Sequence, residues 1–202
     1  MKNIFYFLSI LIFFSCGNSG TSSSSGPEFD LTGYNSSKIN GSSSEFVFNL
    51  AGSGSLLNEG MVKNNVRDGV WISYYNDNDN RINIIANYDN GVLSGPYMEL
   101  NDRGQLEKKM NYVNNEIHGL YVEYRFGRPE KAYMYDNGIL HGVSKEFDNR
   151  GNLIKTTSYK NGELHGDIIQ FDSDGNEILR YEYKNGEKIS GGIVAPTAES
   201  EE

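Results

Sequence analysis

Apolar and aromatic residues occur along this chain in short runs, which clusters of Gly, Asn and Asp separate. Within the runs, residues two positions apart are alike, as at Met110 and Tyr112 or at Tyr133 and Tyr135. A period of two is that of a β-strand, whose successive side chains point to opposite faces. The pattern therefore predicts short strands joined by tight turns. The predicted strands are residues 71–75, 82–88, 97–100, 106–112, 121–124, 131–135, 145–147, 153–159, 168–171 and 178–183.

The chain repeats itself with a period of about 24 residues. The phrase Tyr-x-Asn-Gly occurs at 88–91, 135–138, 159–162 and 183–186, and looser versions fill the gaps. In all units but the last, a Gly follows four residues after this Gly position, and another Gly, or Asn80, stands eleven residues before it. Three markers that keep one register through six units identify an internal repeat. The Asn residues that mark the units are Asn64, Asn90, Asn114, Asn137, Asn161 and Asn185.

The marker glycines are predicted to be turn positions with left-handed backbone. Asn replaces Gly at Asn65, Asn80 and Asn115, and Asn is the other residue that tolerates a positive φ. Asn-Gly between aromatic runs is a strong signal for a β-hairpin. The predicted fold class is therefore all-β, an elongated antiparallel meander of stacked β-hairpins. The structural turn positions are Gly91, Gly95, Gly119, Gly138, Gly142, Gly162, Gly166 and Gly186.

The phrase Tyr-x-Asn-Gly-x-Leu-His-Gly, at 135–142 and 159–166, resembles the MORN repeat. More specifically, it resembles the bacterial variant that is grouped with antitoxins of the toxin–antitoxin type. The resemblance covers residues 62–192, and residues 44–62 read as a worn first unit. It implies an elongated, twisted sheet that serves as a binding surface, and it implies no chemistry.

The N-terminal residues predict that the protein is exported and attached to a membrane. Lys2 precedes the apolar run 4–14, whose 11 residues are fewer than the about 20 that cross a bilayer. The run ends at Ser15-Cys16, which resembles a bacterial lipoprotein signal, and Cys16 would then carry the lipid. The alternative is a Cys that happens to lie beside an ordinary cleavage site. The predicted segments are a signal peptide (1–15), a lipidated Cys and flexible tether (16–43), a repeat domain (44–194) and an acidic disordered tail (195–202).

The net charge limits the classes of partner, and the cysteine count limits the disulfides that can form. The net charge of −9 argues against nucleic-acid binding, which needs a basic surface. A single Cys excludes an intrachain disulfide. The expected location is the bacterial cell envelope, at the outer membrane or the cell surface, with membrane attachment through lipid.

Three groups of polar residues could be read as sites. His118, His141 and His165 occupy one repeat position, so they would run parallel about 9.6 Å apart and would not converge on a metal. The stretch 172–176 resembles a calcium loop but lacks its full ligand spacing. Lys108, Lys131 and Lys155, with Arg180 one residue offset, form a row that is either a solvated strand face or a contact for an acidic partner. Turn chemistry is the expectation for the first two groups, and no metal is expected.

The sequence contains no arrangement typical of catalysis. No Ser lies in a Gly-x-Ser-x-Gly turn, and no glycine-rich phosphate loop is present. No pair of carboxylates stands apart from the many others. We therefore expect no enzyme, no catalytic residue and no cofactor.

Two rows of aromatic positions make a binding surface the leading hypothesis. They are spaced three residues apart, so they lie on opposite faces unless a β-bulge re-aims one of them. The candidate contact residues are Trp71, Tyr97, Tyr121 and Tyr124. The expected function is a non-catalytic binding or scaffold module for an unknown protein. Two alternatives remain open: an antitoxin or immunity protein that neutralises a toxin, and a cell-surface glycan-binding protein.

Overall fold

The computed structural model describes residues 26–77 and 79–194, and in these ranges the protein consists of strands and turns. The predicted signal peptide, Cys16 and the acidic tail lie outside the described residues. The sixteen strands form one sheet. They are β1 (Asn35–Lys38), β2 (Ser44–Leu50), β3 (Leu56–Lys63), β4 (Val66–Tyr74), β5 (Ile82–Asp89), β6 (Val92–Leu100), β7 (Leu106–Val113), β8 (Glu116–Ile117), β9 (Gly119–Arg125), β10 (Arg128–Asp136), β11 (Ile139–Leu140), β12 (Gly142–Phe147), β13 (Leu153–Lys160), β14 (Glu163–Phe171), β15 (Glu177–Lys184) and β16 (Glu187–Ile193).

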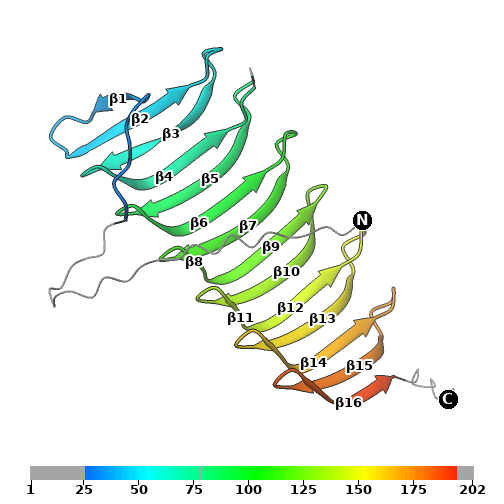
Figure 1. Ribbon diagram of the computed structural model, residues 1–202. Coiled ribbons are helices and arrows are strands. Elements are labelled where there is room, and N and C mark those ends of the chain that lie inside the picture. Colours follow the sequence, from blue (N-terminus) through cyan, green and yellow to red (C-terminus); the bar gives the residue numbers. More distant parts are fainter. Residues whose placement is uncertain (1–25, 78, 195–202) are drawn as a thin grey trace, which may run out of the picture.

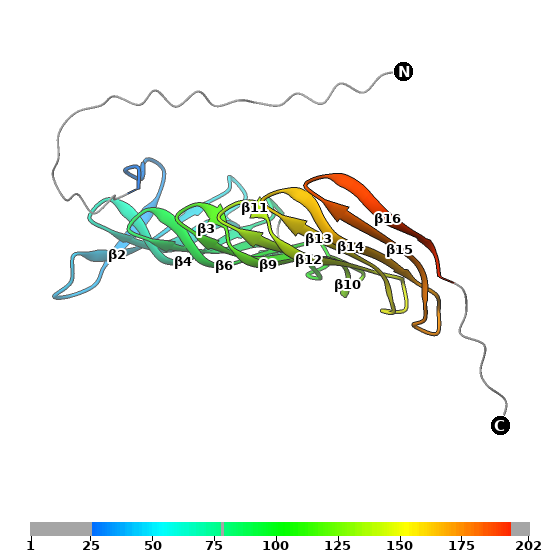
Figure 2. The same ribbon diagram turned by 90° about the horizontal axis from the view of Figure 1, so that it is seen from below.

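The strands follow one another across the sheet in chain order, and every pair is antiparallel. The two-residue strands β8 and β11 precede β9 and β12, from which His118 and His141 separate them. Figure 1 shows the result as a long ladder of hairpins, and Figure 2 shows its twist from below. The prediction of an elongated antiparallel meander is confirmed.

Asn-Gly turns close the hairpins along one rim, which we call the short-turn rim. At the β5–β6 turn, Asp89 pairs with Val92, so the loop contains only Asn90 (φ 49°) and Gly91 (φ 81°). Two successive residues with positive φ form the turn whose twist matches that of the flanking strands. The eight glycines named as turn positions all have positive φ, and so do Asn65, Asn80 and Asn115.

From the β5–β6 turn onward, backbone hydrogen bonds also join each short turn to the preceding hairpin. The N–H of Gly138 donates to the carbonyl of Ile117, and the N–H of Gly162 donates to that of Leu140. The opposite rim carries the turns that join one hairpin to the next, and we call it the long-turn rim.

The β-bulges decide which residues share a face. In the β6–β7 pair, Glu99 faces Lys108 and Leu100 faces Leu106, so the extra residue lies in the second strand. In each pair joined by a long turn, the first strand keeps its regular alternation next to that turn, so residues three apart there point to opposite faces. Trp71 and Tyr74 therefore lie on opposite faces of β4. The face of Trp71, which also carries Tyr97, Tyr112, Tyr121, Tyr133 and Tyr135, is called the tyrosine face below.

Residues 26–43 differ from the expected flexible tether. In the structure, β1 pairs with β2, and the segment before β1 crosses the first hairpins and packs on the core (Figure 1). Its anchors are Phe29, Leu31 and Tyr34, which contact the cluster of Val47, Val62 and Trp71. These three side chains pack on the face of the sheet to which Trp71 belongs.

Candidate binding surface

The tyrosine face is covered at its N-terminal end by the segment Gly26–Tyr34. The Phe29 and Trp71 rings meet edge-on with centroids 4.8 Å apart, and Tyr34 packs against Phe29 at 5.1 Å. Trp71 is only 5% exposed, and its indole N–H donates to the carbonyl of Met61 over 2.9 Å. Trp71, which the sequence suggested as a contact residue, is therefore a core residue in this arrangement.

The guanidinium group of Arg67 contacts three aromatic rings of this cluster. The guanidinium carbon of Arg67 lies 4.6 Å from the ring centre of Phe29, 4.9 Å from that of Trp71 and 5.1 Å from that of Tyr88. Arg67 also donates a hydrogen bond to the hydroxyl of Tyr88 over 2.8 Å. A guanidinium over an aromatic face is attracted by the ring quadrupole, so Arg67 links the covering segment to β4 and β5.

The covering segment is also held through its backbone. The N–H of Phe29 donates to the carbonyl of Asn65, and the N–H of Gly26 donates to that of Asn90, each over 2.7 Å. Both carbonyls belong to turns of the short-turn rim. At Gly26 the approach is so close that a Cβ would lie 2.2 Å from the carbonyl oxygen of Gly91. The face and the rim therefore hold this segment through the side chains of Phe29, Leu31 and Tyr34 and through the backbone N–H groups of Gly26 and Phe29.

Beyond this segment the tyrosine face is uncovered. Tyr97 and Tyr112 form an edge-on pair with centroids 5.4 Å apart. Further along, Tyr121 lies 5.8 Å from Tyr133 and 6.0 Å from Tyr135, so the three rings form one cluster. All five rings are half-buried and retain solvent-accessible surface.

A ladder of alternating charges runs beside these tyrosines. Lys108 is 2.7 Å from Glu99, and Lys155 is 3.0 Å from Glu146. The lysines that the sequence presents as a basic row therefore alternate with carboxylates on the neighbouring strands. The ladder reads Glu99, Lys108, Glu123, Lys131, Glu146 and Lys155. Arg180 lies outside this ladder and pairs with Asp167 and Glu177.

Burial raises the pKa of the hydroxyl groups on the tyrosine face. Loss of solvent, followed by the charge of Glu99, raises the pKa of Tyr97 to about 12. The pKa of Tyr133 is raised to about 12 by burial and then by Glu123, and that of Tyr121 is raised further still by the same two causes. Tyr121 donates to a carboxylate oxygen of Glu123 over 3.1 Å. Near neutral pH the face therefore presents hydroxyl groups that can both donate and accept hydrogen bonds.

The other three contact residues predicted from the sequence do not all lie on one face of the sheet. Tyr97 and Tyr121 lie on the tyrosine face, whereas Tyr124 lies on the opposite face, three residues from Tyr121 on β9. The sequence reasoning did not select Tyr112, Tyr133 or Tyr135, although their alternation with one another was visible. It also missed the contact of Phe29 with Trp71, which no local pattern signals.

The histidines and the aspartate loop take part in turn structure. His118 Nδ1 lies 3.5 Å from Asp136 Oδ1, and His165 Nδ1 lies 3.3 Å from Asn185 Oδ1, each at the next short turn. Asp172 Oδ1 accepts the N–H groups of Asp174 and Asn176, and the Asn176 contact is the main cause that lowers the pKa of Asp172. Within residues 26–77 and 79–194, no three His, Cys, Asp or Glu side chains gather as a metal site would require.

Comparison with protein-family models gives no match for this chain, and comparison with curated proteins gives none either. The part of the chain that the structure describes contains no helix long and apolar enough to cross a membrane. The fold itself is that of an all-β repeat protein built of consecutive hairpins.

Proposed function

We propose that this protein is a non-catalytic binding module of the bacterial cell envelope. A lipid on Cys16 holds it at the membrane, and the tyrosine face binds an extended segment of another protein. The observation that carries this proposal is the segment Gly26–Tyr34, which lies on the same face of the same sheet. The MORN-like phrases support the proposal, because MORN-type sheets are expected to act as interaction surfaces.

The residues of the uncovered face suit this role. Tyr supplies a large, stiff contact area with few rotamers to immobilise, and each aromatic pair contributes roughly 0.5–1.5 kcal/mol beyond the area that it buries. The charge ladder is neutral along its length, so it selects for the position of polar groups in the partner and attracts neither acidic nor basic partners as a class. We therefore expect affinity to depend on the rings and specificity to depend on the ladder.

The experiment is affinity capture of the full lipidated chain from its own envelope after crosslinking, with identification of captured proteins by mass spectrometry. The test variants are Tyr97→Ala and Tyr121→Ala on the tyrosine face. Tyr124→Ala is the matched control, because it removes the same side chain from the opposite face of the same strand as Tyr121.

We expect one protein to be lost from the captured set in the two test variants and retained in the control. Equal capture by all four chains would contradict the proposal. If the face variants instead lose retention on polysaccharide gels, the glycan-binding alternative replaces it. If the captured protein is a toxin encoded next to this chain, the immunity alternative is the correct form of the proposal.

A further inference from the structure

Two neighbouring turns of the short-turn rim hold the backbone of the covering segment. Gly26 donates its N–H to the first residue of the β5–β6 turn, Asn90. Phe29 donates its N–H to the second residue of the β3–β4 turn, Asn65. Neighbouring short turns are two strand spacings apart, about 9.6 Å, and three residues of extended chain span about 10 Å. The step from Gly26 to Phe29 therefore matches one repeat of the sheet.

The sequence of these two turns recurs once along the short-turn rim. The loops that hold the covering segment are Asn-Asn at 64–65 and Asn-Gly at 90–91. The same order follows in the β7–β8 turn, with Asn-Asn at 114–115, and in the β10–β11 turn, with Asn-Gly at 137–138. All eight residues have positive φ, so the two pairs of turns also share their backbone conformation. We call them the first and the second turn pair.

The contacts within each turn pair are the same. The second residue of the later turn donates its N–H to the carbonyl of Arg67 over 2.7 Å in the first pair, and to that of Ile117 over 2.8 Å in the second. The N–H of the first residue faces Asp68 Oδ1 at 3.4 Å and His118 Nδ1 at 3.5 Å, respectively. In the second pair, the loop carbonyls accept no backbone N–H from the part of the chain that the structure describes. The frame that holds the covering segment is therefore present a second time, without an occupant.

The side chains beside the second turn pair can receive an aromatic ring. In the first pair, the ring of Phe29 packs on Trp71 and lies beside the guanidinium that also contacts Tyr88. The residues at the positions of Trp71, Tyr88 and Arg67 in the second pair are Tyr121, Tyr135 and Ile117. The two tyrosine rings have centroids 6.0 Å apart, and all three side chains are half-buried. A ring that entered here would meet two aromatic edges or faces and one aliphatic chain.

The close approach at the later turn requires glycine on both sides. A Cβ at Gly26 would lie 2.2 Å from the carbonyl oxygen of Gly91, and a Cβ at Gly91 would lie 3.0 Å from the Cα of Gly26. Gly138 occupies the place of Gly91 in the second pair, where a Cβ would meet the side chain of Glu116 at 3.9 Å. The second pair therefore offers the same room for a glycine of an incoming segment.

The charges differ between the two pairs and argue for a segment of another protein. Residues 66–68 of the first pair are Val-Arg-Asp, and residues 116–118 of the second are Glu-Ile-His. The first set contains a cation beside a carboxylate, whereas the second has a carboxylate and neither Arg nor Lys. The covering segment of another copy would bring Glu28 to this carboxylate, and like charges repel. The occupant is therefore expected to have neutral or basic residues between its glycine and its aromatic residue.

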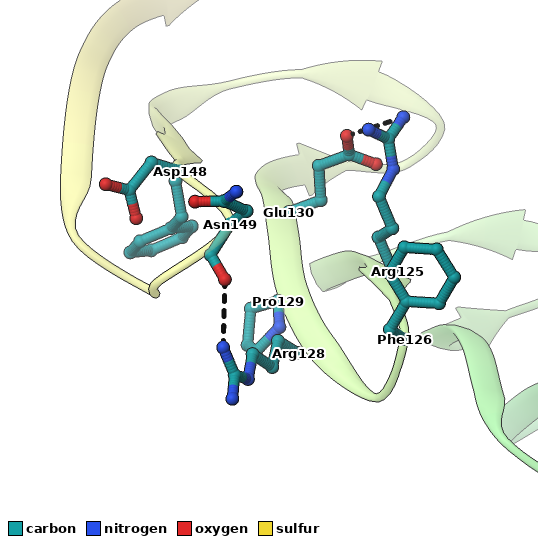
Figure 3. Close-up of a pocket in the computed structure, with 8 residues that line it drawn as sticks. Arg125, Phe126, Arg128, Pro129, Glu130, Asp148 and Asn149 are labelled. Atoms are coloured by element: carbon teal, nitrogen blue, oxygen red, sulfur yellow. Dashed lines mark hydrogen bonds and ion pairs between the residues drawn. The ribbon is translucent and has the colours of Figure 1, made fainter.

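The opposite rim of the same hairpin has its cations in internal contacts. The loop of the β9–β10 turn begins with Phe126, whose φ is 52°. Arg125 Nη2 lies 2.9 Å from Glu130 Oε1, and Arg128 Nη1 donates to the carbonyl of Asn149 over 2.9 Å. These contacts border a hollow of about 350 Å³ between this turn and the β12–β13 turn (Figure 3). They hold the two long turns together, so we place the occupant at the short-turn rim, where the loop carbonyls are open.

We propose that the second turn pair binds an extended segment of another protein with the sequence Gly-x-x-aromatic. This inference rests on the proposed function and names the kind of segment that the tyrosine face takes. The glycine N–H donates to the carbonyl of Asn137, and the N–H of the aromatic residue donates to that of Asn115. The ring packs against Tyr121 and Tyr135. The segment runs toward the N-terminal end of the sheet, as the covering segment does from Gly26 onward.

The probe is an acetylated peptide with the sequence of residues 26–32 in which Glu28 is replaced by Lys, with fluorescein at its C-terminus. It is titrated with the full chain in a mild detergent, and fluorescence anisotropy reports binding. We expect saturable binding that weakens about tenfold or more when the peptide also carries Gly26→Ala, because the added Cβ would collide with the turn. The same loss is expected for Phe29→Ala in the peptide.

Two variants of the protein locate the site. Gly138→Asn adds a side chain where the peptide glycine must lie, while Asn keeps the positive φ of the turn. It should weaken binding about tenfold or more and leave the urea midpoint close to that of the wild type. The matched control is Gly162→Asn, which makes the same exchange in the next Asn-Gly turn, outside the pair, and should bind like the wild type.

Absence of saturable binding up to millimolar concentration would overturn the proposal, and so would equal binding by the Gly138→Asn chain. If the peptide that keeps Glu28 binds as tightly as the Lys version, the charge argument fails and a second copy of this chain is an equally good occupant. The proposed function has a separate readout. If Tyr121→Ala loses a protein captured from the envelope while the peptide does not bind, the tyrosine face keeps its function and Gly-x-x-aromatic is the wrong segment.

Discussion

The ring of Phe29 packs edge-on against Trp71 with centroids 4.8 Å apart, and this contact joins the segment before the sheet to its fourth strand. The two residues are far apart in sequence, and no repeat marker lies at either one. The contact converts a stretch that would otherwise be a linker into part of the core. It also buries the only Trp of the chain, which gives the arrangement a spectroscopic reporter.

Replacing Phe29 by Ala should release the covering segment. Loss of the half-buried ring and of its contact with Arg67 should lower the free energy of unfolding by about 2 kcal/mol. Water would then reach Trp71, so its fluorescence emission should shift to longer wavelength. The control is Phe46→Ala, which removes a ring of the same size from the face of β2 opposite to that of Val47 and the Trp71 cluster. Unchanged emission in Phe29→Ala would show that the segment does not cover Trp71 in solution.

Replacing Phe126 by Asn should stabilise the folded protein. Asn-Gly is the preferred pair for a two-residue loop with two positive φ values, so the change should raise the free energy of unfolding by about 1 kcal/mol. Urea denaturation measures this directly. The reverse change, Asn137→Phe, places a ring at a position with φ 47° and should destabilise by a similar amount. If both variants have the wild-type midpoint, left-handed backbone carries no cost at these turns.

Stability should fall at high pH because of the tyrosine face. The pKa of Tyr97 and of Tyr133 is about 12 in the folded protein and about 10 in the unfolded chain. A raised folded pKa means that the stabilisation is complete below pH 10 and is lost as the pH rises through about 12. Urea midpoints between pH 9 and pH 12 test this, alongside the ultraviolet absorbance of tyrosinate. Tyr97→Phe should flatten the profile, and an equally steep fall in that variant would exclude Tyr97 as a cause.

Reversing one charge in the ladder should lower the free energy of unfolding, and reversing a neighbouring charge as well should restore part of it. Lys108→Glu places three carboxylates side by side on adjacent strands, from Glu99 to Glu123, and should destabilise by about 1 kcal/mol at low salt. Adding Glu99→Lys recreates one opposite-charge pair. A double-mutant cycle from denaturation curves gives the coupling energy, and a coupling of zero would mean that the ladder shapes the surface without stabilising the sheet.

The hairpins could be predicted because their rules are local. The pair Asn90-Gly91 favours a two-residue turn by itself. The same kind of pair recurs in the other repeats, so each of their turns is determined by local residues. The sidedness of Tyr121 and Tyr124 could not be decided, since it depended on which strand of the hairpin held the bulge. The structure places the bulge in β10, between Pro129 and Lys131, so β9 alternates regularly from Tyr121 to Tyr124. The likeness to MORN repeats and the lipid on Cys16 stay predictions.

The covering segment and the β9–β10 turn could not be predicted for a different reason. Phe29 and Tyr34 have no periodic neighbours, and what holds them is a surface formed by residues far along the chain. Phe126 stands where the repeat pattern is one residue shorter, and no local pattern signals its positive φ. In both places the chain departs from its own consensus.

The hydrogen bond from Gly26 to Asn90 determines where mechanical load enters the protein. A pull on the chain ahead of residue 26 does not reach β1 first. It is transmitted to the β5–β6 turn, and from there to the carbonyl of Arg67, which accepts the N–H of Gly91. Tension from the N-terminal side is therefore expected to act on the contacts of Gly26 and Phe29 before it acts on β1. A protein held at a membrane in this way would resist peeling until the Phe29 segment lifts, and would then open one hairpin at a time.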